Sequence, residues 1–404
     1  MRILTLNCRS YFIQFQLCDW ARRAVLARGT VERIELGDSY LTLDRPGRES
    51  RRIEADCPDH RAAVALILQA LTDHYLDLLE NAGGIDAVGH RVVHGGETFT
   101  GSTVIDRPAV AAIRAAADLA PLHNPANAAG IEAAMALLPG VPHVAVFDTA
   151  FHQTMPPHAY LYPLPYEWYE RHGVRRYGFH GASHCHAARR GAALLGRDPA
   201  HCNLVTVHIG NGTSLCAVQG RRSIDTSMGL TPLEGVMMGA RCGDIDPGIL
   251  SFIMQRALLS PHDVDMILNQ KSGVAGITGV RLERHDYLAR AAEGDPRCRL
   301  ALEMEAYRIR KYLGAYAVAV GRLDAVVFGG GAGYLEWLVR ERVLDGMESF
   351  GITLDRERNR AALVDHREET VSAAGSRVPV FVILAEEEMI LAEEVAALLN
   401  GDGS

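Results

Sequence analysis

Arginine, histidine and aspartate side chains recur beside glycine turns along this chain of 404 residues. The segment VGHRVVHGGE places Arg91 and His94 directly before Gly95 and Gly96. The two glycines permit a tight turn and a close approach of a ligand to backbone N–H groups, and a guanidinium offers a planar fork to a carboxylate or phosphate. A buried strand with a surface arginine would use the same residues, so this segment alone leaves both interpretations open.

The segment APLHNPANAAGI has the composition of a turn that leads into a helix. It places His123 and Asn124 before Pro125, and we expect the helix to start at Asn127. Asparagine and proline are common at helix starts for structural reasons alone. His123 is the residue that capping does not require, so it is the candidate for a binding role.

The segment VAVFDTAFH is an apolar run that ends in Asp148, followed by Thr149 and His152. A carboxylate at the end of a buried strand is costly unless it meets a cation or a metal, and ligands gather at strand ends in open α/β sheets. These arguments favour a functional Asp148 over a helix cap.

The segment RRYGFHGASHCHAARR carries His180 and His184 at helical spacing, with Arg175 and Arg176 close by. The spacing would suit two zinc ligands on one helix face. However, neither an acid nor a cysteine pair nearby completes a tetrahedral set. Imidazole beside a glycine turn fits the stabilisation of an anion better.

A long segment punctuated by glycine, SIDTSMGLTPLEGVMMGARCGDIDPG, holds Arg241 between Gly239 and Gly243. Packing alone does not explain this density of glycine around one arginine, and a loop that brings a guanidinium to an anion does. The string G-x-x-x-x-G-K-[ST] does not occur, so a P-loop has no support.

The elements that must position these side chains alternate between strands and helices, which predicts an α/β architecture. Apolar runs such as DAVGHRVV, PHVAVF and DAVVFGGG alternate with Ala-rich helical stretches such as RPAVAAIRAAADL. The opening MRILTLNCRSYFIQFQL repeats later as NLVTVHIGNGTSLCAV, a strand, an Asn-centred turn and a strand. The repeat predicts two similar domains that face each other, although hairpin statistics could produce one such match.

Bulk composition excludes several classes of protein. A hydrophobic fraction of 48% and a charged fraction of 22% are those of a globular chain, and the length predicts two or three domains. The net charge of -8 gives no general attraction to nucleic acid or anionic membrane. Eight scattered cysteines, with neither a signal peptide nor an apolar run long enough to span a bilayer, lead us to expect a cytoplasmic protein.

Together these segments resemble the acetate kinase family of short-chain acyl kinases, within the actin, sugar kinase and Hsp70 superfamily. The strings VFDTAFHQTMP, YGFHGASH, HIGNGTS and DTSMGLTPLEGVMMGARCGDIDPG carry the resemblance, which continues through KSGVAGITG and covers nearly the whole chain. It implies two duplicated ribonuclease-H-like domains of the actin-like ATPase fold. The first would comprise residues 1–149 and 386–404, and the second residues 150–385.

The resemblance also implies a homodimer that transfers a phosphoryl group reversibly between ATP and acetate or propionate, with Mg²⁺ or Mn²⁺. Its partners would be the carboxylate, the acyl phosphate and the nucleotide, with no nucleic acid and no membrane. In the matching positions the family uses Asp148, His180 and Arg241 for catalysis. It uses Arg91, Val93, Leu122, His123, Phe179 and Pro232 to bind substrate. Nucleotide and phosphate would be held by Ser10, His208, Gly210, Asn211, Gly212, Gly331 and Gly333, and the metal by Asn7 and Glu386.

The sequence departs from the family's pattern in the loops expected to hold the nucleotide. The first loop, N-x-G-S-S-S-x-K in the family, has Arg9 for a glycine, Tyr11 and Phe12 for two serines, and Gln14 for the lysine. The family's G-I-G-E-N reads Gly-Ala-Gly-Tyr-Leu at residues 331–335. Three hypotheses follow: an acyl kinase with changed donor binding, which we favour; an acyl kinase that uses pyrophosphate or phosphate; and a weakly catalytic protein that binds acetate or acetyl phosphate.

Overall fold

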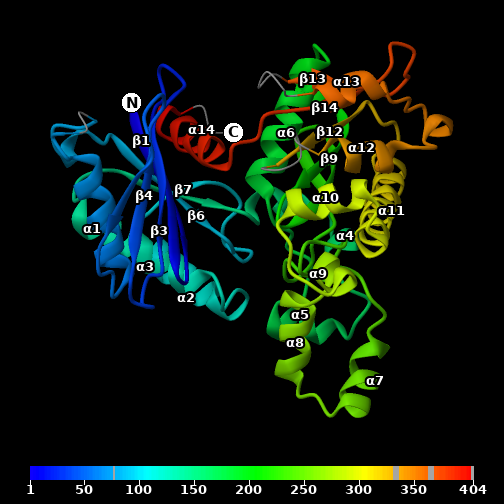
Figure 1. Ribbon diagram of the computed structural model, residues 1–404, viewed down its shortest axis with the longest axis horizontal. Helices are drawn as coiled ribbons and strands as arrows, with labels where there is room; N and C mark the ends of the chain where they lie inside the picture. The colour runs from blue at the N-terminus through cyan, green and yellow to red at the C-terminus, as the bar shows by residue number, and fades with distance from the viewer. Residues whose placement is uncertain (76–77, 331–335, 363–367, 402–404) are drawn as a thin grey trace. The chain divides into compact units, whose positions relative to one another are not determined.

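The computed structural model describes residues 1–75, 78–330, 336–362 and 368–401. The chain divides into two compact units (Figure 1). Unit 1 comprises Met1–Gln153 and Glu386–Ser404, and unit 2 comprises Thr154–Ala385. Each unit is built around one sheet.

Within the described residues, unit 1 has a sheet of eight strands in the order β5-β4-β3-β2-β1-β6-β8-β7. The strands β1, β6 and β8 run parallel to one another, and the others pair antiparallel. Their bounds are β1 Arg2–Arg9, β2 Phe12–Asp19, β3 Ala24–Glu32, β4 Tyr40–Asp44, β5 Arg51–Glu54, β6 Ala87–Val92, β7 Thr103–Val104 and β8 His143–Phe147. The α-helices are α1 His60–Leu71, α2 Arg107–Ala115, α3 Asn124–Leu137 and α14 Glu387–Asn400.

Alternation along β1 decides which side chains reach each face of this sheet. Leu4, Leu6 and Cys8 are buried in the cluster that also contains residues of α1 and α3. On the opposite face, a Cβ added at Gly89 would lie 2.7 Å from Val395 of α14 and 3.6 Å from Thr5. Since Asn7 and Arg9 alternate with Thr5, they belong to the face that α14 covers.

Unit 2 has a sheet of six strands among its described residues, in the order β11-β10-β9-β12-β14-β13. The hairpin of β9 and β10 continues into the parallel strands β12 and β14, as β1 and β2 continue into β6 and β8. The predicted duplicated fold is confirmed by this repeated order. The strands are β9 Asn203–Ile209, β10 Thr213–Gln219, β11 Arg222–Thr226, β12 Ala325–Gly329, β13 Glu369–Thr370 and β14 Val380–Val382.

Two helices of unit 2, α8 and α11, begin at capping residues. Ser260 and Asp263 form a capping box at α8, and Asp295 accepts hydrogen bonds from the Arg297 and Cys298 amides at the start of α11, the longest helix. The helices are α4 Pro157–Tyr160, α5 Tyr166–His172, α6 Gly181–Leu194, α7 Gly248–Ala257, α8 Pro261–Gln270, α9 Gly273–Thr278, α10 Arg284–Glu293, α11 Pro296–Ala319, α12 Trp337–Leu344 and α13 Arg356–Ala361.

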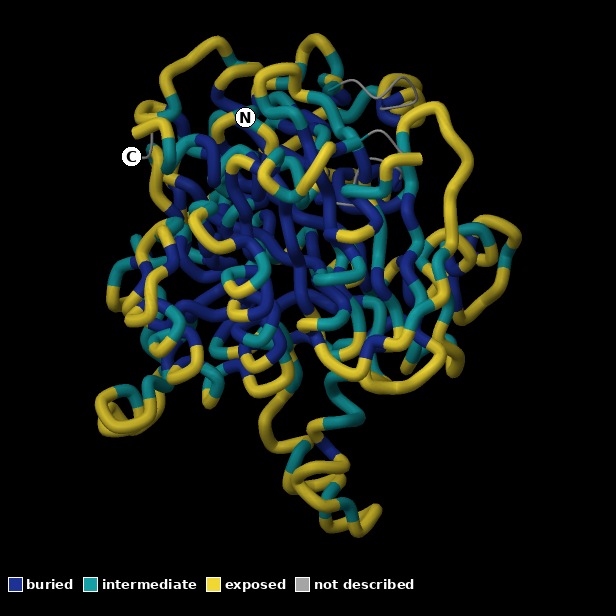
Figure 2. The backbone as a smooth tube through the Cα atoms, turned by 90° about the vertical axis from the view of Figure 1, so that its left-hand side faces the viewer, coloured by how far each residue is buried: buried dark blue, intermediate teal, exposed yellow. Residues whose placement is uncertain are grey.

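Two helices cover equivalent faces of the two sheets. In unit 1, α14 covers the face that carries Asn7. In unit 2, α6 covers the face that carries His208, because Ser183 and His184 on α6 contact His208 and Thr206 of β9. Figure 2 marks the buried residues in dark blue; they include most of β1, β6, β8, β9 and β12, whereas α7 has no buried residue.

Most predicted elements are confirmed, including the strands that end near Arg91 and Asp148 and the long helix α11. One expectation is wrong: α3 begins at Asn124, not at Asn127, because the chain is already helical after the cap residue His123. All eight cysteines are free thiols in the described part of the chain. Within that part, no helix combines the length and the hydropathy that crossing a membrane requires.

Candidate functional site

The carboxyl ends of three parallel strands form the first group of candidate residues, in unit 1. Arg9 ends β1, Arg91 lies next to the end of β6, and Asp148 directly follows β8. Parallel strands end at the same edge of a sheet, so the topology gathers these side chains there. The α14 helix begins at this edge as well, because Glu387 in its first turn contacts Arg91.

Arg91 is the centre of this group. Its Nε and Nη2 donate to the two carboxylate oxygens of Asp148 at 3.0 Å and 2.9 Å, and its Nη1 donates to Glu387 at 3.0 Å. Burial alone would lower the pKa of Arg91, but Asp148 and Glu387 outweigh it and raise the pKa above its ordinary value. The bidentate contact with the Arg91 guanidinium, a permanent cation, therefore offsets the desolvation cost of the buried Asp148 carboxylate.

The backbone that follows Arg91 is fixed by two asparagines of α3. Asn127 accepts from the Val93 amide at 3.0 Å and donates to the Cys8 carbonyl at 2.7 Å. Asn124 accepts from the His94 amide and donates to the His94 carbonyl. These contacts tie α3 to β1 and to the backbone just before the double glycine. Both asparagines therefore have a structural role.

The first loop lies between β1 and β2 as a tight hairpin. Ser10 Oγ donates to the Leu122 carbonyl at 3.3 Å, which ties the loop to the segment containing His123. The Arg9 guanidinium lies 5.4 Å from the Phe12 ring centroid. Burial and Arg91 lower the pKa of Arg9, while Glu387 and Asp148 oppose that shift, so Arg9 lies within electrostatic range of the Arg91 group.

His180 is the first candidate in unit 2. It caps α6 with a φ of +59°, a left-handed conformation that is uncommon for a residue other than glycine. Its Nδ1 is hydrogen-bonded to Ser214 Oγ at 2.9 Å. Ser214 also bonds His184 Nε2 at 2.8 Å, and His184 Nδ1 bonds Thr206 at 2.7 Å. The predicted pair of histidines therefore shares a serine.

His208 lies beside His180. Their rings stack with centroids 4.1 Å apart, and His208 Nδ1 is hydrogen-bonded to Ser183 at 2.9 Å. A Cβ added at Gly210 would lie 3.4 Å from His208 Nε2. The turn between β9 and β10 thus runs close over this imidazole, as a turn that presents backbone N–H groups to a ligand would.

Gly212 brings His180 and Arg241 together. A Cβ added at Gly212 would lie 3.2 Å from His180 Cε1 and 3.3 Å from Arg241 Nη1. Arg241 Nη1 also donates to the Pro232 carbonyl at 3.4 Å. Two side chains far apart in sequence, both candidates for anion stabilisation, therefore lie against the same glycine.

The loop that carries Arg241 is held by the KSGVAGITG segment. The Val274 amide donates to the Met238 carbonyl and the Ala275 amide to the Gly239 carbonyl, both at 2.9 Å. A Cβ added at Gly273, which has a φ of +60°, would lie 2.1 Å from the Met238 carbonyl oxygen. Only glycine fits this position, which explains a motif that has no chemistry of its own.

The structure places the predicted site residues in two groups. Unit 1 holds Asn7, Ser10, Arg91, Val93, Leu122, His123, Asp148 and Glu386. Unit 2 holds Phe179, His180, His208, Gly210, Asn211, Gly212, Pro232 and Arg241. The predicted Gly331 and Gly333, with Tyr334, lie outside the described residues.

Sequence reasoning missed three contributors: Glu387, Ser183 and Ser214. Glu387 was one of three successive glutamates, and only the helix start that follows Glu386 shows which of them contacts Arg91. The two serines follow strongly predicted site residues within a few positions, and that proximity was the available signal.

Candidate oxygen donors for a metal lie in unit 1. Asn7 lies on the α14-covered face of β1, Asp148 follows β8, and Glu386 and Glu387 open α14. In the described part of the chain, histidine, cysteine and carboxylate side chains form no group of three with the geometry of a metal site. Mg²⁺ commonly takes only one or two protein carboxylates and fills its other positions with water and phosphate oxygens, so this sparse set fits that ion.

Comparisons with known proteins agree over nearly the whole length. The sequence profile described as the acetokinase family matches residues 2–393. An acetate kinase of Geobacter sulfurreducens is 55% identical over 401 residues, covering 99% of this chain and 95% of the relative. The crystal structure of Porphyromonas gingivalis acetate kinase superposes with a TM-score of 0.95 at 42% identity, covering 98% of this chain and 99% of its own. A propionate kinase structure from Francisella tularensis gives a TM-score of 0.89 at 34% identity, covering 97% of this chain and 98% of its own.

Proposed function

The chain belongs to the acetokinase family, and on that premise we propose that it transfers a phosphoryl group reversibly between ATP and a short-chain carboxylate, acetate or propionate. The product in one direction is an acyl phosphate. The observation that carries this proposal is the meeting of His180 and Arg241 against Gly212, which lies in the β9–β10 turn. The names of the similar proteins, acetate kinase and propionate kinase, supply the substrate class.

The chemistry requires charge neutralisation more than proton transfer. A carboxylate with a pKa of about 4–5 is already an anionic nucleophile at neutral pH, so the reaction needs no general base. The loose, in-line transition state of phosphoryl transfer spreads negative charge over the oxygens of the transferred phosphoryl group. Arg241 and His180 stabilise that charge, and Arg91 and His123 place the anionic groups.

The β9–β10 turn holds the nucleotide phosphates in this proposal. Gly210, Asn211 and Gly212 allow backbone N–H groups to approach phosphate oxygens, and His208 supports them from β9. In the corresponding first loop of unit 1, the Ser10 hydroxyl is the group that we expect to bind phosphate.

Mg²⁺ completes the proposal. Asn7 and Glu386 would hold the ion, and Asp148, which follows β8 in the same sheet, would supply a further carboxylate. When bound, the metal supplies neutralisation of phosphate charge. Arg91 keeps the Asp148 carboxylate oriented with or without the ion, through the two hydrogen bonds at 3.0 Å and 2.9 Å.

Apolar side chains limit the size of the acid that this proposal allows to bind. The apolar residues at the positions expected for acid binding are Val93, Leu122, Phe179 and Pro232. One methylene in an apolar acid-binding pocket is worth only about 1–3 kcal/mol, so acetate and propionate are both substrates and differ by about 10- to 200-fold at most.

A second copy of the chain is the remaining partner. The helix α7 exposes Ile249, Phe252 and Ile253, and Leu258 follows it with 90% of its surface exposed. A row of exposed apolar side chains on a helix with no buried residue supports a homodimer formed through unit 2. Sedimentation analysis of the chain and of its Phe252→Asp variant tests this: we expect a dimer and a monomer, respectively, and a monomeric parent chain would refute it.

The test of the proposed function is a trapping assay with several donors. The purified protein, Mg²⁺ and acetate are incubated with ATP, GTP or pyrophosphate, and acyl phosphate is trapped as hydroxamate. ATP-dependent product is expected. Product from pyrophosphate alone would favour the second hypothesis, and saturable acetate binding with no product from any donor would favour a binding protein.

A further inference from the structure

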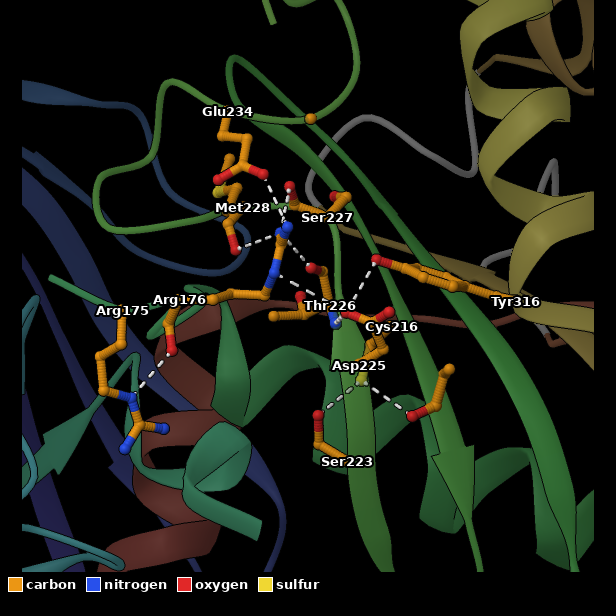
Figure 3. Close-up of polar contacts among 12 residues, drawn as sticks. Arg175, Arg176, Cys216, Ser223, Asp225, Thr226, Ser227, Met228, Glu234 and Tyr316 are labelled. Atoms are coloured by element: carbon orange, nitrogen blue, oxygen red, sulfur yellow. Dashed lines mark hydrogen bonds and ion pairs between the residues drawn. The ribbon is translucent and has the colours of Figure 1, made fainter. Parts of the chain in front are cut away.

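One guanidinium organises the segment of residues 226–234 in unit 2. Arg176 Nη1 donates to three successive carbonyls, those of Thr226 at 2.7 Å, Ser227 at 3.1 Å and Met228 at 3.3 Å. Its Nη2 donates to Glu234 at 2.6 Å. Figure 3 shows these groups converging on the Arg176 side chain from both ends of the segment. The segment is therefore wrapped around a single charge.

Glu234 and Tyr162 hold the middle of the 226–234 segment. The Tyr162 hydroxyl donates to Glu234 Oε2 and accepts from the Leu230 amide at 3.0 Å. A Cβ added at Gly229 would lie 1.7 Å from Glu234 Oε2 and 2.1 Å from the Tyr162 hydroxyl oxygen. The backbone at Gly229 thus passes in direct contact with the two side chains.

The charge state of this cluster is fixed by its surroundings. Burial alone would lower the pKa of Arg176, but Glu234 and Asp225 help to raise it above its ordinary value. Burial and the neighbouring Glu234 also raise the pKa of Tyr162. Arg176 is a permanent cation and Tyr162 a neutral donor throughout the physiological pH range.

The wrapped segment has two contacts with the proposed site. The Gly229 carbonyl accepts from the Tyr177 amide at 3.0 Å and the Gly178 amide at 3.2 Å, immediately before His180. Three residues later, the Pro232 carbonyl accepts from Arg241 Nη1. One short segment therefore contacts both the turn that leads to His180 and the side chain of Arg241.

We propose that Arg176, Glu234 and Tyr162 form a positioning cluster that sets His180 and Arg241 in place relative to each other. The three residues act through the 226–234 backbone and touch no reacting atom. The kinetic consequence rests on the proposed phosphoryl transfer, whereas the structural consequence does not.

The test compares Glu234→Gln, Tyr162→Phe and Arg176→Lys with the control Arg222→Lys, an exposed arginine on the neighbouring strand β11. Hydrogen exchange of the Tyr177 and Gly178 amides is measured first, because it requires no turnover. We expect exchange at these amides to accelerate at least about 10-fold in the three variants, with exchange in α11 unchanged. The control should match the parent chain.

The kinetic arm measures kcat, and KM for ATP and for the acid. Displacement of His180 and Arg241 should lower kcat about 10- to 100-fold while KM for ATP stays within about 2-fold. Unchanged amide exchange, or accelerated exchange with kcat as in the parent chain, would overturn the inference. A loss of activity that tracks only the unfolded fraction would also overturn it. A parent chain without turnover would refute the proposed function, and amide exchange alone would then decide whether the cluster holds the segment.

Discussion

Arg91 holds both carboxylate oxygens of Asp148, at 3.0 Å and 2.9 Å, across two neighbouring parallel strands. The contact fixes the rotamers of both side chains and leaves Glu387 to bind the remaining guanidinium nitrogen at 3.0 Å. A carboxylate held in this way keeps its orientation before any ligand arrives. Pre-organisation of this kind lowers the cost of alignment during phosphoryl transfer.

Asp148→Asn should lower kcat at least about 100-fold, because the amide loses the charge and one of the two acceptors that Arg91 uses. We also expect the free energy of unfolding to fall by about 1–3 kcal/mol, measured by urea denaturation. Asp118→Asn, at an exposed carboxylate of unit 1 outside the candidate site, is the control and should leave both quantities unchanged. Activity of Asp148→Asn comparable with the parent chain would contradict the role given to Asp148.

Gly212→Ala should lower kcat about 10- to 100-fold with little change in stability. The new methyl group would lie 3.2–3.4 Å from His180 and Arg241, closer than ordinary contact, so one of them must move. Gly212 is not among the glycines with positive φ, so alanine adds no backbone strain. The control is Gly375→Ala, where a Cβ meets nothing within 4 Å. Equal kcat for the two variants would contradict the packing of His180 and Arg241 against this glycine.

Acid should destabilise unit 1 through a buried histidine pair. His90 Nε2 and His143 Nδ1 lie 2.9 Å apart, and burial lowers the pKa of both below 6.5. Below about pH 6.5 the two histidines are protonated in the unfolded chain but stay neutral in the folded chain. The free energy of unfolding is therefore highest above that pH and falls as the pH decreases. The slope should approach about 1.4 kcal/mol per pH unit for each histidine.

Urea denaturation between pH 8 and pH 5 measures this slope. His143→Gln should make it shallower, and His74→Gln, at an exposed histidine, should leave it unchanged. Identical slopes for the parent chain and His143→Gln would show that the pair does not control acid stability.

Arg9→Ala should raise KM for ATP about 5- to 10-fold and leave KM for the acid unchanged. Arg9 ends the strand whose α14-covered face also carries Asn7, and its charge interacts with Arg91, Asp148 and Glu387. We expect this cation to compensate for the lysine that the first loop lacks. Steady-state kinetics with ATP and with pyrophosphate will show which donor depends on Arg9. Unchanged KM for both donors would remove Arg9 from the phosphate site.

The fold could be predicted from the sequence because its signals are local and repeated. Alternation of strands and helices gave the α/β class, and the similarity of residues 1–17 to residues 203–218 gave the duplication. Both depend on backbone patterns that tertiary packing reinforces. The start of α3 was misjudged because asparagine and proline at Asn124 and Pro125 suit either side of a helix boundary.

The positions of the candidate site residues could be predicted where strand ends determine them, and could not where helix rotation or long-range contacts decide. Arg91 and Asp148 follow from their positions at the ends of β6 and β8. The contact of Glu387 with Arg91 depends on how α14 packs over Gly89, which the sequence does not specify within one turn. His180 contacts Ser214, 34 residues away in the sequence, and Arg176 contacts residues 50 to 58 positions away, so neither arrangement is encoded locally.

The most direct measurement for the central claim is ³¹P NMR of the purified chain with Mg²⁺, ATP and acetate. The account predicts that resonances of ADP and acetyl phosphate grow together, and that Arg241→Ala reduces the rate at least about 100-fold. No acetyl phosphate from the parent chain with ATP, GTP or pyrophosphate, while the protein remains folded, would contradict it.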